Sequence, residues 1–138
     1  MHEFFQQHRL LLAPMAGVSD EAFRMLCREQ GADLTYTEMV SAKGLSFANE
    51  KTRHLLHLAP GEDQVAVQLF GHEPDTMAAQ AAWVEGEMGE SLAYLDINMG
   101  CPARKLCRRA TARRSCATLT WPVLSCGPCG RQWSIRLR

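Results

Sequence analysis

One cysteine of the chain lies where a reactive thiol could meet a substrate. Cys101 stands between Gly100 and Pro102, directly after a predicted strand. A free thiol has a pKa of about 8.5, so at neutral pH it is mostly protonated and can donate a proton as a general acid. Most lone cysteines are small buried apolar residues, but catalytic side chains gather where strands open into loops. Residue type and position make Cys101 a candidate for acid chemistry, beside the commoner role of a small buried apolar residue.

Three further polar side chains recur at a regular spacing. Glu38, Gln68 and Asn98 stand thirty residues apart, and each lies at the carboxyl end of a predicted apolar strand. Barrel enzymes of the (β/α)8 type place their chemistry at these strand ends. The alternative is that strands simply become polar where they emerge from the core. Three residues in phase favour the barrel interpretation.

Four predicted strands would position these residues. They cover residues 9–13, 33–39, 65–70 and 92–98. The strands are apolar almost throughout, as expected for parallel strands that are covered on both faces. Helical or irregular segments alternate with them along the chain. The pattern predicts an α/β fold.

The connecting segments carry the signals that start and stop helices. Ser19 is predicted to cap a first helix, whose apolar face includes Leu26. Residues 41–58 are predicted to form a mostly helical or irregular connection. Pro74 suits the first turn of a further helix, which is predicted to end near Gly89. Each of the first three predicted strands is thus followed by a helical or irregular segment.

The charge of the chain is divided between two unlike segments. Residues 1–106 carry eight basic and fifteen acidic side chains, a net charge of −7, whereas residues 107–138 carry seven arginines and no acid. We therefore predict a folded domain over 1–106 and an irregular Arg- and Cys-rich tail over 107–138. Translation in a shifted reading frame would produce such a tail. The alternative is a basic tail that binds RNA phosphates.

Cysteines and histidines of the chain give little support for a metal or redox centre. Cys126 and Cys129 have the spacing of a thioredoxin motif, but too few residues follow them to form the helix and strand that this motif requires. A zinc site that adds Cys107 and Cys116 would lack a second close pair. We therefore expect no metal. Three histidines show no ligand spacing and are assigned no role: His54, His57 and His72.

The start of the chain lacks the basic region and the long apolar run of a signal peptide. No stretch approaches the roughly 20 apolar residues that a bilayer requires. The use of cysteine is also not that of a disulfide framework. We expect a soluble cytoplasmic protein that does not bind a membrane.

Four blocks of sequence resemble a known family. Over about residues 9–105 the chain resembles the bacterial tRNA-dihydrouridine synthases. The most specific feature is Asn-x-Gly-Cys-Pro after a fourth strand, whereas Pro-Met-Ala-Gly is shared with other flavin-dependent barrels. In order, the blocks are APMAGVSD (13–20), TEM (37–39), VQLFG (67–71) and DINMGCP (96–102).

The resemblance implies a flavoprotein that reduces selected uridines of tRNA to 5,6-dihydrouridine. It implies FMN as the cofactor, NADPH as the reductant and tRNA as the partner. Reduced flavin would supply the hydride to the uracil ring, and Cys101 the proton. The implied binding residues are Pro14, Met15, Ala16 and Gln68 for the flavin, Asn98 for the target uracil and Arg104 for RNA phosphate.

For the fold, the resemblance implies the first four βα units of a TIM barrel. Because a complete barrel takes about 250 residues, we expect the chain to be an incomplete and inactive fragment. Its open edges could self-associate. Two alternatives stay open at this point. One is another FMN-dependent barrel oxidoreductase, such as a relative of dihydroorotate dehydrogenase, and the other is a non-catalytic RNA-binding or redox module built on the tail.

Overall fold

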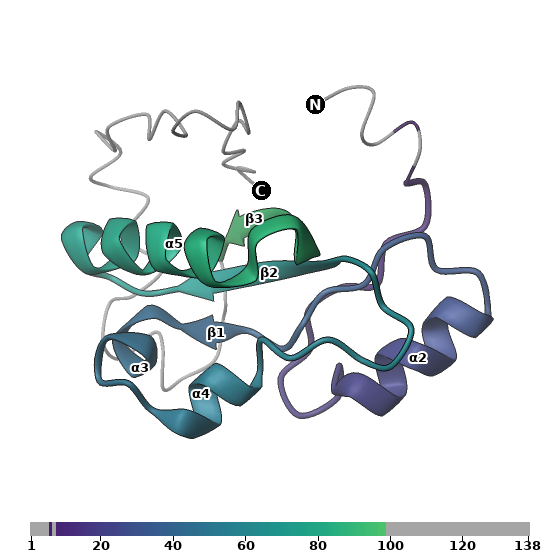
Figure 1. The fold of residues 1–138 in the computed structure, drawn as a ribbon, viewed down its shortest axis with the longest axis horizontal. Coiled ribbons are helices and arrows are strands. Elements are labelled where there is room, and N and C mark those ends of the chain that lie inside the picture. The colour runs from purple at the N-terminus through teal and green to yellow at the C-terminus, as the bar shows by residue number, and fades with distance from the viewer. Residues whose placement is uncertain (1–5, 7, 99–138) are drawn as a thin grey trace.

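The central sheet is parallel, and its strands follow one another in chain order. The computed structural model describes residue 6 and residues 8–98. Three strands pair in the order β1-β2-β3, namely β1 (Val40–Ser41), β2 (Val65–Phe70) and β3 (Leu92–Ile97) (Figure 1). Two isolated parallel bridges, Leu11 to Leu34 and Tyr36 to Ala66, extend this order towards the N-terminus. The predicted α/β class is confirmed.

Helices connect the strands, and those that follow β1 and β2 pack against one face of the sheet. α3 (Ala42–Ser46) packs against α5 (Pro74–Met88), and α5 contacts both β2 and β3. Figure 1 shows α5 running alongside these two strands. None of the helices among the described residues is long and apolar enough to cross a bilayer. The helical elements are α2 (Glu21–Glu29), α3 (Ala42–Ser46), α4 (Glu50–His54), α5 (Pro74–Met88) and the short 3-10 turn η1 (Gly89–Ser91).

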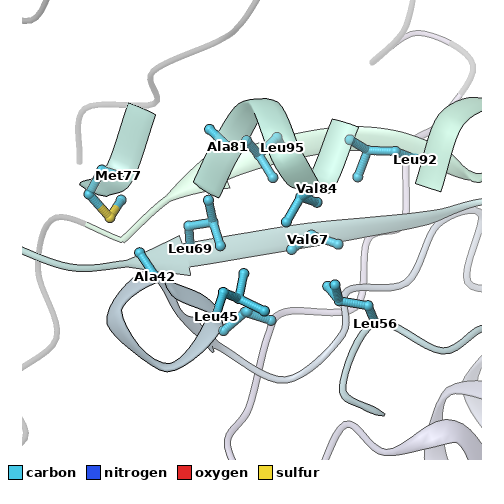
Figure 2. Close-up of a cluster of buried hydrophobic side chains, with 11 residues drawn as sticks. Ala42, Leu45, Leu56, Val67, Leu69, Met77, Ala81, Val84, Leu92 and Leu95 are labelled. Atoms are coloured by element: carbon cyan, nitrogen blue, oxygen red, sulfur yellow. The ribbon is translucent and has the colours of Figure 1, made fainter. Parts of the chain in front are cut away.

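Strand β2 is buried on both of its faces. Val67 and Leu69 pack into the larger core between the sheet and the helices, and Figure 2 shows them between side chains of α5 and of α3. Ala66 points the other way, where it packs with Leu34 and Tyr36 in a second cluster. Burial on two faces explains why the sequence of β2 is apolar at almost every position.

Each side of β2 meets a neighbour that contains one extra residue. On one side, Tyr36 pairs with Ala66 and Val40 pairs with Leu69, so four steps along the first segment span three steps along β2. On the other side, the register shifts between Val65 and Ala66, opposite Leu92 and Tyr94 of β3. An extra residue interrupts the ladder and turns the strand, as a β-bulge does.

This irregular pairing explains where the predicted strands differ from the structure. The strand predicted at residues 65–70 is confirmed, and the one predicted at 92–98 begins as expected and ends at Ile97. Residues 9–13 and 33–39 pair only through isolated bridges, and the regular strand β1 begins one residue after the second of these ranges. The prediction that residues 41–58 form a mostly helical or irregular connection is confirmed by α3 and α4, although Ser41 still belongs to β1.

The first helix begins and faces differently from the prediction. Its N-cap is Asp20, whose carboxylate accepts a hydrogen bond from the backbone N–H of Phe23. Ser19, the predicted cap, is buried and instead bonds the backbone of Met15. The face of Leu26 is exposed, and the buried side chain of α2 is that of Arg24. Sequence periodicity missed this arrangement because the helix buries a charge.

Large apolar side chains are exposed on the N-terminal part of the fold. Their exposed fractions are 56% for Leu10, 45% for Val18, 58% for Leu26 and 73% for Phe47. All four precede β2 in the chain. They come from different elements of the fold, and self-association through such exposed apolar side chains stays a prediction.

A buried ion pair joins α2 to the loop that precedes β2. The guanidinium of Arg24 donates to Glu62, with Nη2 at 2.9 Å from Oε2 and Nε at 3.1 Å from Oε1. The side chains are 2% and 0% exposed. Arg24 also donates to the backbone carbonyls of Ser19 (3.2 Å) and His57 (2.7 Å). A single side chain therefore holds three separate segments.

The carboxylate of Glu62 has two further donors. The hydroxyl of Thr35 donates to Oε1 at 2.6 Å, and the backbone N–H of Ala59 donates to Oε2 at 2.6 Å. Burial by itself would raise the pKa of Glu62, but hydrogen bonds from Arg24, Thr35 and Ala59 outweigh it and hold that pKa below its ordinary value of 4.5. The ion pair is thus one whose buried charges are compensated, as a stable buried pair requires.

Replacing Glu62 by Gln should destabilise the fold by about 3–5 kcal/mol, because Arg24 would remain buried without a countercharge. Urea unfolding followed by circular dichroism would measure the change. Since the folded pKa of Glu62 lies below 4.5, its contribution is present above that value and is lost as the pH falls through the folded pKa. The Glu62→Gln variant should therefore lose part of its acid sensitivity. Glu87→Gln, on the exposed side of α5, is the control, and equal effects of the two substitutions would contradict this assignment.

Candidate functional site

Three polar side chains meet near the carboxyl ends of β2 and β3. Gln68 lies between the other two: its Nε2 donates to Asp96 Oδ2 at 2.5 Å, and its Oε1 accepts from Asn98 Nδ2 at 2.8 Å. Asp96 is 9% exposed, and the other two are half-buried. The backbone N–H of Asn98 also donates to the carbonyl of Leu69 at 2.8 Å. Adjacent parallel strands thus present a connected row of an acid and two amides.

The row has a fixed direction. The carboxylate oxygen of Asp96 accepts a hydrogen bond, so the amide nitrogen of Gln68 is turned towards it. The carbonyl oxygen of Gln68 then faces Asn98, and the amide nitrogen of Asn98 faces Gln68. Because an amide group is planar, Oδ1 of Asn98 is directed away from Gln68. The acid at one end therefore sets the orientation of both amides.

The irregular segment before β1 brings two more side chains to this end of the sheet. Asn98 Nδ2 lies 3.1 Å from the sulfur of Met39. Glu38 accepts a hydrogen bond from the backbone N–H of Gly17. Both residues lie in the stretch that contains the extra residue, and a bulge of this kind commonly redirects side chains beside a functional site. Strands that are distant in sequence are thereby linked at one edge.

The loop over residues 14–18 is held in a closed turn. The backbone N–H groups of Val18 and Ser19 both donate to the carbonyl of Met15, and the hydroxyl of Ser19 bonds the N–H and the carbonyl of the same residue. Gly17 has a φ of +74°, which disfavours residues with a Cβ. A Cβ at this position would meet no atom within 4 Å among the described residues. The backbone conformation, and not crowding, therefore favours glycine here.

The structure brings several of the predicted site residues together. Gln68 and Asn98 are in direct contact. The closed turn contains Pro14, Met15 and Ala16. Glu38 holds this turn by accepting a hydrogen bond from the N–H of Gly17. The predicted acid Cys101 and the predicted phosphate contact Arg104 lie outside the described residues.

Two residues of the site were missed in the sequence. Asp96 was not singled out, although it stands two residues before Asn98, the interval at which side chains of one strand share a face. Met39 gave no signal, because its contact with Asn98 depends on the extra residue before β1. An acid inside an apolar strand would have been the signal for Asp96.

A hollow of about 470 Å³ lies beside α2. It is lined by residues of α2 and α4 and by Glu38. A second hollow of about 610 Å³ lies between α4, α5 and the start of α2. Gln68 and Asn98 line neither of these two hollows. The polar row is therefore separate from both.

Comparison with known proteins identifies the family. The model of the family described as dihydrouridine synthase (Dus) matches residues 11–111. This range includes every predicted site residue and continues a few residues past the domain boundary predicted at 106.

Curated relatives agree with this match. The tRNA-dihydrouridine synthase B of Pseudomonas aeruginosa is 46% identical over 105 residues, covering 75% of this chain and 30% of the relative. The protein of the same name from Pasteurella multocida is 43% identical over 120 residues (86% and 34%), and that of Escherichia coli K12 is 43% identical over 105 residues (75% and 31%). The chain spans about a third of the length of the curated relatives it matches, and it belongs to the dihydrouridine synthase family.

Proposed function

We propose that the complete protein is a flavin-dependent enzyme that reduces uridine to 5,6-dihydrouridine in tRNA. The observation that carries the proposal is the contact between Gln68 and Asn98 at the carboxyl edge of a parallel sheet, in a chain of the dihydrouridine synthase family. Carboxyl edges are where α/β folds bind ligands and place catalytic groups. The names of the curated relatives supply the reaction.

The fold supports a barrel as the setting of this reaction. Four parallel segments follow one another in chain order without a change of direction, whereas open doubly wound sheets reverse their order at a switch point. We infer that residues 1–106 supply the first four βα units and that later segments of the complete protein close the barrel. The exposed apolar side chains before β2 would then be covered by those segments or by a second copy of the chain.

The residues present fit FMN at the polar row. The half-buried amide of Gln68 has two N–H groups and two acceptor lone pairs, of which Asp96 and Asn98 each engage one. The pyrimidine ring of a flavin offers an alternating edge of donors and acceptors that such an amide can match. Pro14, Met15 and Ala16 would contact the ring from the closed turn, where backbone N–H and carbonyl groups are the natural partners. FMN, when bound and reduced by NADPH, supplies the hydride.

Cys101 and Asn98 would act on the substrate. The amide of Asn98, oriented through Gln68, would hold the target uracil by its carbonyl and N–H groups. Cys101, three residues further along the chain, would deliver a proton from its Sγ to C5 of the ring while C6 gains hydride. Arg104 would contact an RNA phosphate, which fixes the position of the nucleotide but not its identity. The uridine must leave its stack to reach this site.

Replacing Cys101 by Ala should lower the rate of dihydrouridine formation about 10²- to 10⁴-fold, because a positioned general acid contributes that much. The test uses a chimera in which residues 9–105 replace the matching part of the Escherichia coli relative, so that the barrel is complete. Mass spectrometry of tRNA nucleosides measures the product, and the flavin absorbance shows whether the cofactor is retained. Cys27→Ala, in α2, is the control. Full activity of the Cys101→Ala chimera with bound flavin would refute the proposal for this residue.

Asp96→Asn should weaken FMN binding on the order of tenfold in the same chimera, since a charged hydrogen bond contributes roughly 1.5–3 kcal/mol. The physical reason is that an amide at position 96 can donate as well as accept, which releases the orientation of Gln68. Quenching of flavin fluorescence measures the affinity. Gln64→Ala removes a hydrogen bond to the carbonyl of Glu90, outside the polar row, and should leave FMN affinity unchanged. Equal affinities of the Asp96→Asn variant and the parent would argue against a positioning role for Asp96.

The tail over residues 107–138 is proposed to be the product of a shifted reading frame. If so, one of the other two frames of the coding DNA after about codon 106 should continue with alternating strand and helix patterns and mixed charge. Deleting the tail should then leave the folding of residues 8–98 unchanged by circular dichroism. A loss of folding, or the absence of such a pattern in either frame, would favour a tail that belongs to the protein.

A further inference from the structure

Two histidines and a glutamate converge where α2 meets the segment around α4. Each of Glu21, His54 and His57 offers one ligand atom, and these atoms all lie within 4.8 Å of one another. Both histidines are exposed, and Glu21 is half-buried. From the sequence, His54 and His57 show no ligand spacing and were assigned no role, and Glu21 lies more than thirty residues earlier in the chain.

The buried Arg24 holds this group in register. Arg24 lies one helical turn after Glu21 on α2, and residues three apart share a helix face. Its Nη2 donates to the backbone carbonyl of His57 at 2.7 Å, and its ion pair with Glu62 fixes the guanidinium. The N-cap Asp20 fixes the start of the helix, immediately before Glu21. These contacts therefore fix the backbone on both sides of the group, at the start of α2 and at His57.

The two imidazoles are arranged by the backbone. The N–H of His57 donates to the carbonyl of His54 at 3.1 Å, which makes one turn of chain and puts both rings on the same side. The ring centroids are 4.5 Å apart, with the planes at 76°. Arg53 is the neighbouring cation. Its guanidinium carbon lies 5.1 Å from the centre of the Trp83 ring, so its charge makes a cation–π contact with that ring.

The group is open to solvent on two sides. Glu21 and His54 line the hollow of about 470 Å³, and Glu21 and His57 line the hollow of about 610 Å³. An ion could therefore enter and keep water at its remaining positions. Two imidazoles and a carboxylate are the ligand set that zinc enzymes and non-haem iron enzymes use when they keep positions open.

We propose that Glu21, His54 and His57 bind a divalent first-row transition metal. Bonds of about 2.1 Å place ligand atoms roughly 3 Å apart, so the side chains need to close by only an ångström or two, within the reach of side-chain rotation. The metal would fasten α2 to the segment of α4 directly above the Arg24–Glu62 pair, and would so reinforce the same junction from outside. The site is independent of the proposed redox function.

The test is a titration of the full chain with Ni²⁺, followed through the ring signals of its five histidines by ¹H–¹³C spectroscopy. Ni²⁺ prefers imidazole and broadens nearby signals, so binding at the cysteines of the chain would not imitate the expected result. At less than one equivalent, the signals of His54 and His57 should broaden before that of His72, which lies outside the group. Mg²⁺, which prefers oxygen ligands, should have no effect at the same concentration.

Variants assign the ligands. His57→Ala should abolish the early broadening of His54, and His54→Ala that of His57, while Glu21→Gln should weaken binding on the order of tenfold or more. His72→Ala should change neither. Circular dichroism checks that each variant is folded, which is expected because the substituted side chains are not in the core. Broadening of His72 together with the pair, or unchanged broadening of His54 in folded His57→Ala, would overturn the proposal.

Discussion

The Arg24–Glu62 ion pair is the constraint on which the arrangement of the described residues depends. A buried guanidinium must have its N–H groups satisfied and its charge matched. Here the partners come from the turn before α2, the end of the α4 segment and the loop before β2. Three segments are thereby held at one point. The cost of leaving any of these polar groups unpaired excludes alternative placements of α2, although its apolar residues would by themselves favour another face.

The ion pair and the candidate site lie at different ends of the sheet. The ion pair and its donors Thr35 and Ala59 lie towards the beginnings of the parallel segments. The row of Asp96, Gln68 and Asn98 lies near their carboxyl ends. The ion pair and the candidate site thus lie at opposite ends of the sheet, and (β/α)8 barrels divide stability and chemistry between their ends in the same way. A change in the polar row can therefore affect ligands without loosening the junction that α2 makes.

The irregular register on both sides of β2 links the core to the candidate site. A regular ladder from Tyr36 onward would have alternated side chains between the two faces at every residue. The extra residue before Val40 interrupts that alternation and brings Met39 to Asn98, while Glu38 reaches the turn at Gly17. As a result, the segment before β2 pairs regularly only over the two residues of β1. The irregular segment therefore adds Met39 to the edge at which β2 and β3 present their polar row.

Local patterns in the sequence determined the elements whose causes are local. The apolar run of β2, Pro74 at the start of α5 and Gly89 at its end were all predicted, because each depends on the residues of a single segment. The recurrence of Glu38, Gln68 and Asn98 also indicated the edge at which the site lies. Only the tertiary structure showed that Arg24 is the buried side of α2, that Asp96 orients two amides, and that Glu21 meets two histidines. Each of these depends on partners 28 or more residues away, and pairing over such distances is decided by how the segments pack, not by any local pattern of residues.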